Sequence, residues 1–518
     1  MFNTADKSSN NPIHETFKDI TALMVIKSSL KVMWHIYKLE GFKMSLRVVP
    51  IIWTLIVAVR GFAHYHFLEY EKVKQAKLGS TEAEETTLSL TEQEKFRQLG
   101  SYLCKQLNKL GPTFIKIGQM FSTRADLLPL PAMLELAKLQ EEVNPFPNDI
   151  AFKQIEADLG KSKDDLFASF EDDPIAAASL SQAYKAELFD GRKVVVKVQR
   201  PNLFKIITSD VNIIASIADE VMNYPTLCRH TDWPSVVTEF AKTIYEEIDY
   251  LKEGRNADRF RHNLRKFENI CIPRIIWKLT GRHVLTIEYV DGAKITDVKA
   301  INDMGFSVDE ITKLGAEFYL KQLLEDGFFH ADPHPGNMRV MIDGRVGIFD
   351  FGMVGRLSPE LKQNLINAFL HVLRNDYMAL IEDFVNMKIL SQNVDREALY
   401  NDLAPIIQAR FNSKMSKIRF KQVLFDFSDV CWRYPFSLPS EFTYIMRALL
   451  TLEGVALSIN PQFDFISAAM PFAQSIVLKN NKTIGTALLK EVFTHGKFNP
   501  KRAFTLIRAA AKFKANYF

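Results

Sequence analysis

The chain has 518 residues, of which 47% are hydrophobic and 24% are charged. This composition is typical of a globular protein with a sizeable core, and the length predicts two or more structural units. The 65 basic and 61 acidic side chains leave a formal net charge of +4, which is too small to indicate nucleic-acid binding. Four widely spaced cysteines without a C-x-x-C pair indicate a reducing compartment and exclude a disulfide framework or a cysteine zinc site.

Residues 1–92 are predicted to form a helical region at a membrane surface, followed by a linker. Their polar start lacks the charged, apolar and small-residue pattern of a secretory signal. An apolar run of about a dozen residues, Val48 to Val59, is short of the roughly 20 that span a bilayer. Trp34, Trp53 and Tyr65 favour a lipid interface, so residues 15–70 are interpreted as interfacial helices that lie on a membrane or on a partner. A helical hairpin packed on the protein's own core and a true span stay open as alternatives.

Residues 93–174 are predicted to form a helical extension. Thr91 and Glu94 resemble a capping box that opens a helix, and Gly111-Pro112 ends it. From residue 175 the pattern changes to strands at 183–188 and 194–198, joined by a hairpin turn at Asp190-Gly191. One long helix is expected from 234 to 264 and a strand at 287–290. Residues 175–292 therefore form a small strand-rich lobe.

Residues 293–455 are predicted to form a larger, mainly helical lobe, followed by a basic helical region at 456–518. Between Lys479 and Phe518 there are nine Lys or Arg and one acid. Such a basic amphipathic helix suits an anionic lipid surface, and equally a solvated surface helix with an apolar stripe facing the core. A small strand-rich part followed by a larger helical part predicts an α+β fold with two lobes.

Two short motifs carry the chemistry. His330-Ala-Asp332-Pro-His334-Pro-Gly-Asn337 is followed, about a dozen residues later, by Asp350-Phe-Gly. Protein kinases use this order and spacing on a nucleoside triphosphate. Asp332 is predicted to act as the base or to orient water, and Asn337 and Asp350 are predicted to bind Mg²⁺. A polar loop with helix-capping carboxylates is the structural alternative, and a metal site built from His330, Asp332 and His334 is a weaker one.

A kinase-like site also needs a strand lysine for the α and β phosphates and a helical glutamate that holds it. Lys197, within Val195-Val-Lys-Val198, suits the first role, because a charge in an apolar strand needs a partner or a ligand. The glutamate is expected from the helix at 234–264. The candidates are Glu239, Glu246 and Glu247, among which the sequence does not choose.

The loop that covers the phosphates is expected just before these strands. A protein kinase places G-x-G-x-x-G there, whereas this chain has alanines and serines: Ala176, Ala177, Ala178 and Ser179. Alanine narrows the accessible backbone angles and brings methyl groups near the phosphates. We therefore expect a stiffer loop than in an ordinary kinase, with the start of an alanine-rich helix as the alternative.

Over roughly residues 95–455 the chain resembles the UbiB family of aarF-domain atypical kinases. Four elements carry this resemblance: Lys116-Ile-Gly-Gln119 as the K-x-G-Q motif, Ala176 to Ser179 as the alanine-rich loop, Glu247-Ile-Asp249 as the E-x-D motif, and His330 to Asn337 with Asp350-Phe-Gly. Ser181 and Gly254 depart from the residues common in relatives, which are Gly and Ala.

The resemblance implies a kinase-like fold with an added K-x-G-Q helical extension that folds over the cleft. Lys116 and Gln119 would then lie near the nucleotide, together with Glu247 and Asp249, and Lys116 would share in catalysis with Lys197 and Asp332. A covered cleft argues against phosphorylation of other proteins. It favours ATP hydrolysis or phosphorylation of a small lipid-like molecule, with ATP or ADP and Mg²⁺ as cofactors.

The resemblance further implies a role in isoprenoid quinone or other prenyl-lipid metabolism. The expected partners are a membrane lipid surface, prenyl-lipid intermediates or their biosynthetic enzymes, and no nucleic acid. The expected location is peripheral, on the cytoplasmic face of a membrane, or else on an organellar or photosynthetic membrane. Two other functions stay open: a small-molecule kinase of the aminoglycoside or choline phosphotransferase type, in which K-x-G-Q has no role, and a non-catalytic scaffold that binds nucleotide.

Overall fold

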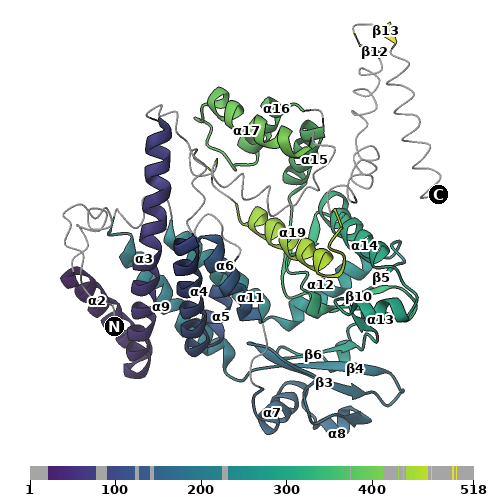
Figure 1. Ribbon diagram of the computed structural model, residues 1–518. Coiled ribbons are helices and arrows are strands. Elements are labelled where there is room, and N and C mark those ends of the chain that lie inside the picture. Colours follow the sequence, from purple (N-terminus) through teal and green to yellow (C-terminus); the bar gives the residue numbers. More distant parts are fainter. Residues whose placement is uncertain are drawn as a thin grey trace. The chain divides into compact units, whose positions relative to one another are not determined.

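The computed structural model describes residues 22–77, 90–122, 128–140, 145–224, 232–373, 375–411 and 439–464, with a few isolated positions between 430 and 498. It divides into two compact units. Unit 1 comprises Met1–Arg255 and Arg274–Tyr289, and unit 2 comprises Asn256–Pro273 and Val290–Phe518. Many of their elements are labelled in Figure 1.

Unit 1 contains an antiparallel sheet with the strand order β1-β3-β4-β6, in which β2 also pairs with β3. The strands are β1 (Ser169–Phe170), β2 (Ala176–Ala177), β3 (Ser181–Glu187), β4 (Lys193–Gln199) and β6 (Val284–Glu288). The predicted hairpin between β3 and β4 forms, and Gly191 takes its turn position at φ +82°. The strand predicted at 287–290 is β6, which begins at Val284 and ends at Glu288.

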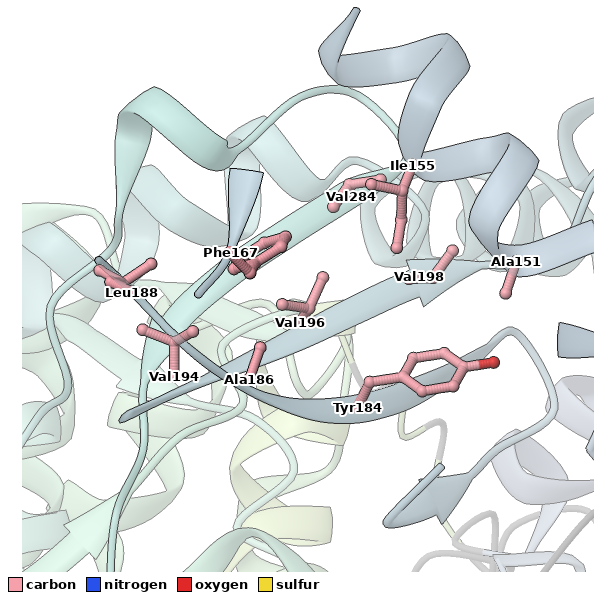
Figure 2. Packing of buried hydrophobic residues seen from close by; sticks show 10 residues of the cluster. All are labelled: Ala151, Ile155, Phe167, Tyr184, Ala186, Leu188, Val194, Val196, Val198 and Val284. Carbon is pink, nitrogen blue, oxygen red and sulfur yellow. The ribbon is translucent and has the colours of Figure 1, made fainter. Parts of the chain in front are cut away.

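Helices α7 (Asn148–Leu159) and α8 (Lys163–Leu166) pack against this sheet. Alternate residues of β3 and β4 are buried, as the two-residue period of a half-covered strand requires. Figure 2 shows Tyr184, Val196 and Val198 gathering with Ile155 of α7 in one apolar cluster. This packing holds β4, and with it Lys197, in a fixed place.

The other helices of unit 1 precede β1 or lie between β4 and β6 in the chain. They are α2 (Ala22–Glu40), α3 (Phe42–Lys77), α4 (Leu90–Leu110), α5 (Pro112–Phe121), α6 (Leu130–Ala137), α9 (Leu203–Val221), α11 (Trp233–Glu247) and the start of α12 (Tyr250–Asn263), with short 3-10 turns η1 (Lys138–Gln140) and η2 (Trp277–Leu279). The prediction of a single helix from 234 to 264 is wrong. The chain breaks between α11 and α12, where the Asp249 carboxylate accepts the backbone N–H of Lys252 and caps α12.

Helices α2 and α3 pack with α5 and α9 through one apolar face each. The shared cluster contains Val32 and Ile36 of α2, Val48 and Ile51 of α3, Phe114 of α5 and Ile213 of α9. Arg47 of α3 donates from Nε and Nη2 to both carboxylate oxygens of the fully buried Asp210 on α9, at 2.6 and 3.0 Å. Unit 1 therefore includes α2 and α3 as part of its core.

Unit 2 has two small sheets surrounded by helices. One has the order β5-β10-β9-β7 and the other pairs β8 with β11. The strands are β5 (Ile270–Cys271), β7 (Ala293–Lys294), β8 (Phe328–His330), β9 (Met338–Val340), β10 (Val346–Ile348) and β11 (Val354–Arg356). Strands β8, β9 and β10 place the two motifs, because His330 ends β8, Asn337 precedes β9 and Asp350 follows β10.

The helices of unit 2 lie between β7 and β9 or follow β11 in the chain. They are α13 (Val298–Asp303), α14 (Val308–Leu320), the π-helix η3 (Lys321–Asp326), the 3-10 turn η4 (Pro335–Asn337), α15 (Pro359–Leu373), α16 (Tyr377–Asn386), α17 (Arg396–Phe411) and α19 (Ser440–Ile459). Two short strands, β12 (Phe493–Thr494) and β13 (Lys497–Phe498), pair further on. Most of the predicted basic C-terminal helix lies outside the described residues.

Candidate active site

In unit 1, the strand lysine Lys197 forms an ion pair with a buried carboxylate. Its Nζ donates to both carboxylate oxygens of Glu253, at 3.0 and 3.1 Å. The Glu253 side chain is 2% exposed, whereas 23% of the Lys197 side chain reaches solvent. The ammonium also lies 5.3 Å from the ring centre of Tyr250. A strand lysine held by a helical glutamate is the arrangement with which kinases bind the α and β phosphates.

This pairing corrects the prediction, which placed the partner of Lys197 among Glu239, Glu246 and Glu247. Those three lie on α11, whereas Glu253 lies on α12, beyond the break that the sequence did not indicate. A signal for Glu253 exists in the sequence. Glu253 stands at helical spacing among apolar residues that are buried on α12. A carboxylate on such a face requires a partner.

The K-x-G-Q helix α5 is joined to the E-x-D motif by a second ion pair. Lys116 Nζ donates to Glu247 Oε1 at the end of α11, and both side chains are mostly buried. Asp249, two residues on, is exposed and caps α12 rather than contacting α5. The E-x-D motif therefore uses its first carboxylate to hold the extension and its second to start the helix that carries Glu253.

Gln119 has a structural contact inside the extension. Its Nε2 donates to the carbonyl oxygen of Leu139 in η1 at 2.8 Å, and the residue is 7% exposed. Gly118 beside it lies where a methyl group would meet the side-chain ends of Leu139 and Leu107. The motif thus packs α5 closely against η1 and α4, and a nucleotide-binding role of Gln119 stays a prediction.

The alanine-rich loop is held at its base and its tip. The N–H of Ala178 donates to the carbonyl of Ser181 at 2.8 Å. The guanidinium of Arg200, whose pKa is lowered by burial, donates to the Ala178 carbonyl at 3.1 and 3.3 Å. Ser179 and Leu180 are buried at the tip, and Leu180 belongs to a cluster that includes side chains of α5. Ala176 and Ala177 form β2, so the alternative of an alanine-rich helix start is wrong.

In unit 2, Asp332 is held by an arginine that none of the sequence motifs contains. Arg447 of α19 donates from Nη2 to Asp332 Oδ2 at 2.7 Å, with 8% of the arginine side chain exposed and 22% of the aspartate. Arg447 is the single charge in an apolar stretch of α19 from 442 to 452. A charge in such a helix needs a partner, and this signal could have indicated it.

His330 orients the backbone of the motif. Its Nδ1 accepts the backbone N–H of Asp332 at 3.1 Å, so the neutral ring carries its proton on Nε2. Complete burial lowers the pKa of His330, although the carboxylates of Asp350 and Asp332 oppose this. The ring also lies 5.6 Å from that of Phe351.

Asn337 and Asp350 stand at the ends of neighbouring strands of one sheet. The backbone N–H of Phe349 donates to the Asn337 carbonyl at 3.3 Å, and the Asp350 carboxylate accepts the N–H of Gly352 at 3.2 Å. In the described part of the chain, no group of three or more His, Cys, Asp or Glu side chains is placed to hold a metal ion. The alternative metal site of His330, Asp332 and His334 is therefore wrong. One amide and one carboxylate fit Mg²⁺, which usually completes its shell with phosphate oxygens and water.

Comparison with known proteins agrees with these motifs. The family model of the ABC1 atypical kinase-like domain matches residues 138–384, and that of the UbiB helical domain matches residues 403–464. The "Uncharacterized protein slr1919" of Synechocystis sp. is 38% identical over 415 residues, which cover 80% of this chain and 73% of that protein. This chain belongs to the UbiB family of ABC1 atypical kinase-like proteins. Its mixed α+β, kinase-like fold with a C-terminal helical region is confirmed.

Other UbiB-family relatives are longer than the matched part. The chloroplastic protein ACTIVITY OF BC1 COMPLEX KINASE 3 of Arabidopsis thaliana is 37% identical over 406 residues, 78% of this chain and 57% of that protein. The chain covers 59% of a second Synechocystis protein, sll0005. Among solved structures, the complex of Rv3197 with erythromycin from Mycobacterium tuberculosis has a TM-score of 0.46 and 23% identity, covering 66% of this chain and 87% of that one.

One departure from the UbiB pattern has a local physical reason. A Cβ at Gly254 would lie 2.8 Å from Cη2 of Trp277, so the indole occupies the space that a methyl group at this position would need. Gly254 follows Glu253 on α12. The glycine therefore brings the Trp277 ring against the helix turn that carries the partner of Lys197.

Two helices are long and apolar enough to cross a bilayer: Phe42–Phe62 within α3, and Glu441–Ile459 within α19. The first extends beyond the run of about a dozen residues expected from the sequence. One face of α3 packs in the core of unit 1, and half of the α19 stretch is buried. Length and composition alone do not distinguish such helices from core helices.

Proposed function

We propose that this protein is an atypical kinase-like ATPase or phosphotransferase that uses Mg-ATP. The observation that carries the proposal is the ion pair between Lys197 and the buried Glu253. Such a pair keeps an ammonium extended and charged on a rigid strand, where it can neutralise phosphate oxygens. The family match over residues 138–384 supports the same function.

The residues of unit 2 receive complementary roles in this proposal. Asp332 accepts the proton of the attacking water or hydroxyl, and Asn337 and Asp350 hold Mg²⁺. Bound Mg²⁺ supplies positive charge to the phosphate oxygens. Phosphoryl transfer needs positioning and electrostatic stabilisation rather than a covalent enzyme intermediate, and this set of residues meets that need.

We propose water or a small lipid-like molecule, rather than another protein, as the acceptor. Helix α5 is built into unit 1 through the Lys116–Glu247 pair and through the cluster that joins it to Leu180 of the alanine-rich loop. An element fixed in this way does not behave as a detachable arm. In the UbiB family it is expected to cover the cleft, which favours small acceptors.

The direct test is Mg²⁺-dependent ATP hydrolysis by the purified protein, with and without anionic liposomes, beside Asp350→Asn. Hydrolysis that depends on Mg²⁺ and disappears in the variant supports the proposal. Full turnover by Asp350→Asn overturns the metal assignment. Nucleotide binding without hydrolysis under both conditions favours a non-catalytic scaffold. Phosphate transfer to a soluble alcohol that is unchanged in Lys116→Ala favours a small-molecule phosphotransferase.

We further propose that the reaction takes place at a membrane and serves prenyl-lipid or quinone metabolism, on an organellar or photosynthetic membrane or a cytoplasmic face. The names of the chloroplastic relatives support such a location. The surface of α2 and α3 supports membrane contact. Opposite the packed face, each helix exposes an apolar stripe at helical spacing: Ile26, Leu30, Trp34 and Tyr37 on α2, and Phe42, Leu46, Val49 and Trp53 on α3.

The composition of these stripes suits a lipid interface. Trp34 and Trp53 are 58% and 61% exposed, and Lys38 lies 5.1 Å from the Trp34 ring centre. Tryptophan beside lysine is typical of helices that lie at the headgroup level. Sedimentation with anionic vesicles tests this surface. We expect Trp34→Ser/Trp53→Ser to lose most vesicle binding, while Trp277→Ser retains it, and equal binding by all three proteins would contradict the proposal.

A further inference from the structure

The helical domain that follows the kinase-like domain contributes a side chain to the catalytic motif. Asp332 lies in the segment matched by the ABC1 domain, and Arg447 lies in the segment matched by the UbiB helical domain. Their side chains meet at 2.7 Å through one pair of atoms, Nη2 and Oδ2. The two residues are 115 positions apart in sequence, so this contact depends on the packing of α19 within unit 2.

Two further polar atoms of this pair are buried and unused. Asp332 Oδ1 and Arg447 Nε each have no hydrogen-bond partner within the described residues. A buried oxygen or N–H that lacks a partner costs free energy, so native proteins seldom retain one without a ligand. Here one atom is an acceptor and the other is a donor.

A hydroxyl group matches both atoms. Its hydrogen can be donated to Asp332 Oδ1, and its oxygen can accept the N–H of Arg447 Nε. The attacking water, or the hydroxyl of an acceptor, has this chemistry. A guanidinium is also rigid and planar, so binding Oδ2 through Nη2 restricts the rotation of the carboxylate.

The position of α19 does not depend on the ion pair alone. Ile445, Leu452, Val455 and Ile459 of the same helix are buried, and the hydroxyl of the buried Tyr319 donates to the Ile445 carbonyl at 3.3 Å. These contacts fix the helix in unit 2. A purely structural role for Arg447 would leave the unused Nε and Oδ1 without an explanation.

We propose that Arg447 is a positioning residue that orients Asp332 toward the attacking hydroxyl. This inference rests on the proposed function. As the hydroxyl oxygen bonds to the γ-phosphorus, its proton passes to Asp332 Oδ1. The bond between that phosphorus and the bridging oxygen breaks, and its electron pair leaves with ADP. Arg447 holds Oδ2 throughout and takes no proton.

The test compares Arg447→Ala with the wild type and with Arg396→Ala, in which a half-buried arginine of the same unit, paired with Glu382, is removed. We expect Arg447→Ala to lower kcat on the order of 10²-fold, while the KM for ATP changes little, because proton transfer rather than nucleotide binding is impaired. Millimolar methylguanidinium, which can occupy the vacated space, should restore at least part of kcat. It should not restore activity in Asp332→Asn, and Arg396→Ala should behave as the wild type.

Two results overturn the inference. One is an unchanged kcat in Arg447→Ala while Asp332→Asn is inactive. The other is a loss of activity that only follows loss of folded protein and that methylguanidinium does not reverse.

A thermal readout separates this inference from the proposed function if the wild type shows no hydrolysis. Methylguanidinium should raise the Tm of Arg447→Ala and leave the Tm of Arg447→Ala/Asp332→Asn unchanged. A rise in Tm confined to Arg447→Ala supports the pairing of Arg447 with Asp332 even if the protein hydrolyses no ATP. If the Tm of neither variant rises, the pairing is contradicted together with the proposed hydrolysis.

Discussion

Lys197 and Glu253 form a bidentate contact in which the ammonium lies 3.0 and 3.1 Å from the two carboxylate oxygens. The carboxylate is 2% exposed, and the ion pair with the lysine offsets the cost of burying its charge in unit 1. The same lysine is the group proposed to bind phosphate. The ion pair therefore connects the packing of α12 with nucleotide affinity.

Replacing Glu253 with Gln is expected to weaken nucleotide-dependent activity strongly. Removing one partner of a buried, hydrogen-bonded charge pair costs about 2–5 kcal/mol, which corresponds to a loss in kcat/KM on the order of 10²-fold. Titration of ATP in a hydrolysis assay measures this loss. Glu246→Gln on α11 is the matched control, because Glu246 pairs with the partly exposed Lys252 and should retain nearly full activity. Equal losses in both variants would contradict the assignment of Glu253.

The glycine of the K-x-G-Q motif is expected to be required by packing. Gly118→Ala directs a methyl group against Leu139 and Leu107, and such overpacking costs about 1–3 kcal/mol. Urea unfolding measures the change. In a Leu139→Ala background the same substitution should cost less, because the closest contact is then removed and only the Leu107 side chain remains near the methyl group. Gly454→Ala, which meets no atom within 4 Å, should not destabilise the protein. A full cost in the Leu139→Ala background would be inconsistent with this explanation.

The buried pair of α3 and α9 is expected to be a major source of stability in unit 1. Asp210 is fully buried and accepts two hydrogen bonds from Arg47. Arg47→Ala leaves this carboxylate unpaired, so we expect a loss of about 3–5 kcal/mol in the free energy of unfolding. Lys31→Ala removes a lysine that is 70% exposed and should cost no more than about 1 kcal/mol. Tryptophan fluorescence in urea compares the two variants, and losses of similar size would refute the ranking.

The contact between α2 and α9 is expected to weaken in acid through Glu220. Burial alone would raise the pKa of Glu220, but hydrogen bonds from Lys31 and Ser28 outweigh it and lower the pKa below its ordinary value of 4.5. A carboxylate with a lowered pKa in the folded state stabilises the protein above its unfolded pKa and loses this effect as the pH falls. The difference in unfolding free energy between wild type and Glu220→Gln should therefore shrink as the pH falls below 4.5. A difference that stays constant as the pH falls through this range would exclude this role.

The motifs that identify the family are local, so they are visible in the amino-acid sequence. Asp332, Asn337 and Asp350 lie within 19 residues of one another, and Lys197 lies on a strand whose alternation is visible in the chain. Spacing of this kind is set by the backbone geometry of a short loop or strand. The family, the α+β fold and the β3–β4 hairpin could therefore be predicted from the amino-acid sequence alone.

The partners of these charged groups were decided only by the tertiary structure. Glu253 is 56 residues from Lys197, and Arg447 is 115 residues from Asp332. Several carboxylates and arginines occur at comparable distances in sequence. Which one is buried beside the motif depends on where α11 ends, how α12 begins and how α19 packs. Burial makes an unpaired charge costly, so packing over long sequence separations selects the partner. The local sequence indicates only that a charge on an apolar helix face needs a partner, and not which residue that partner is.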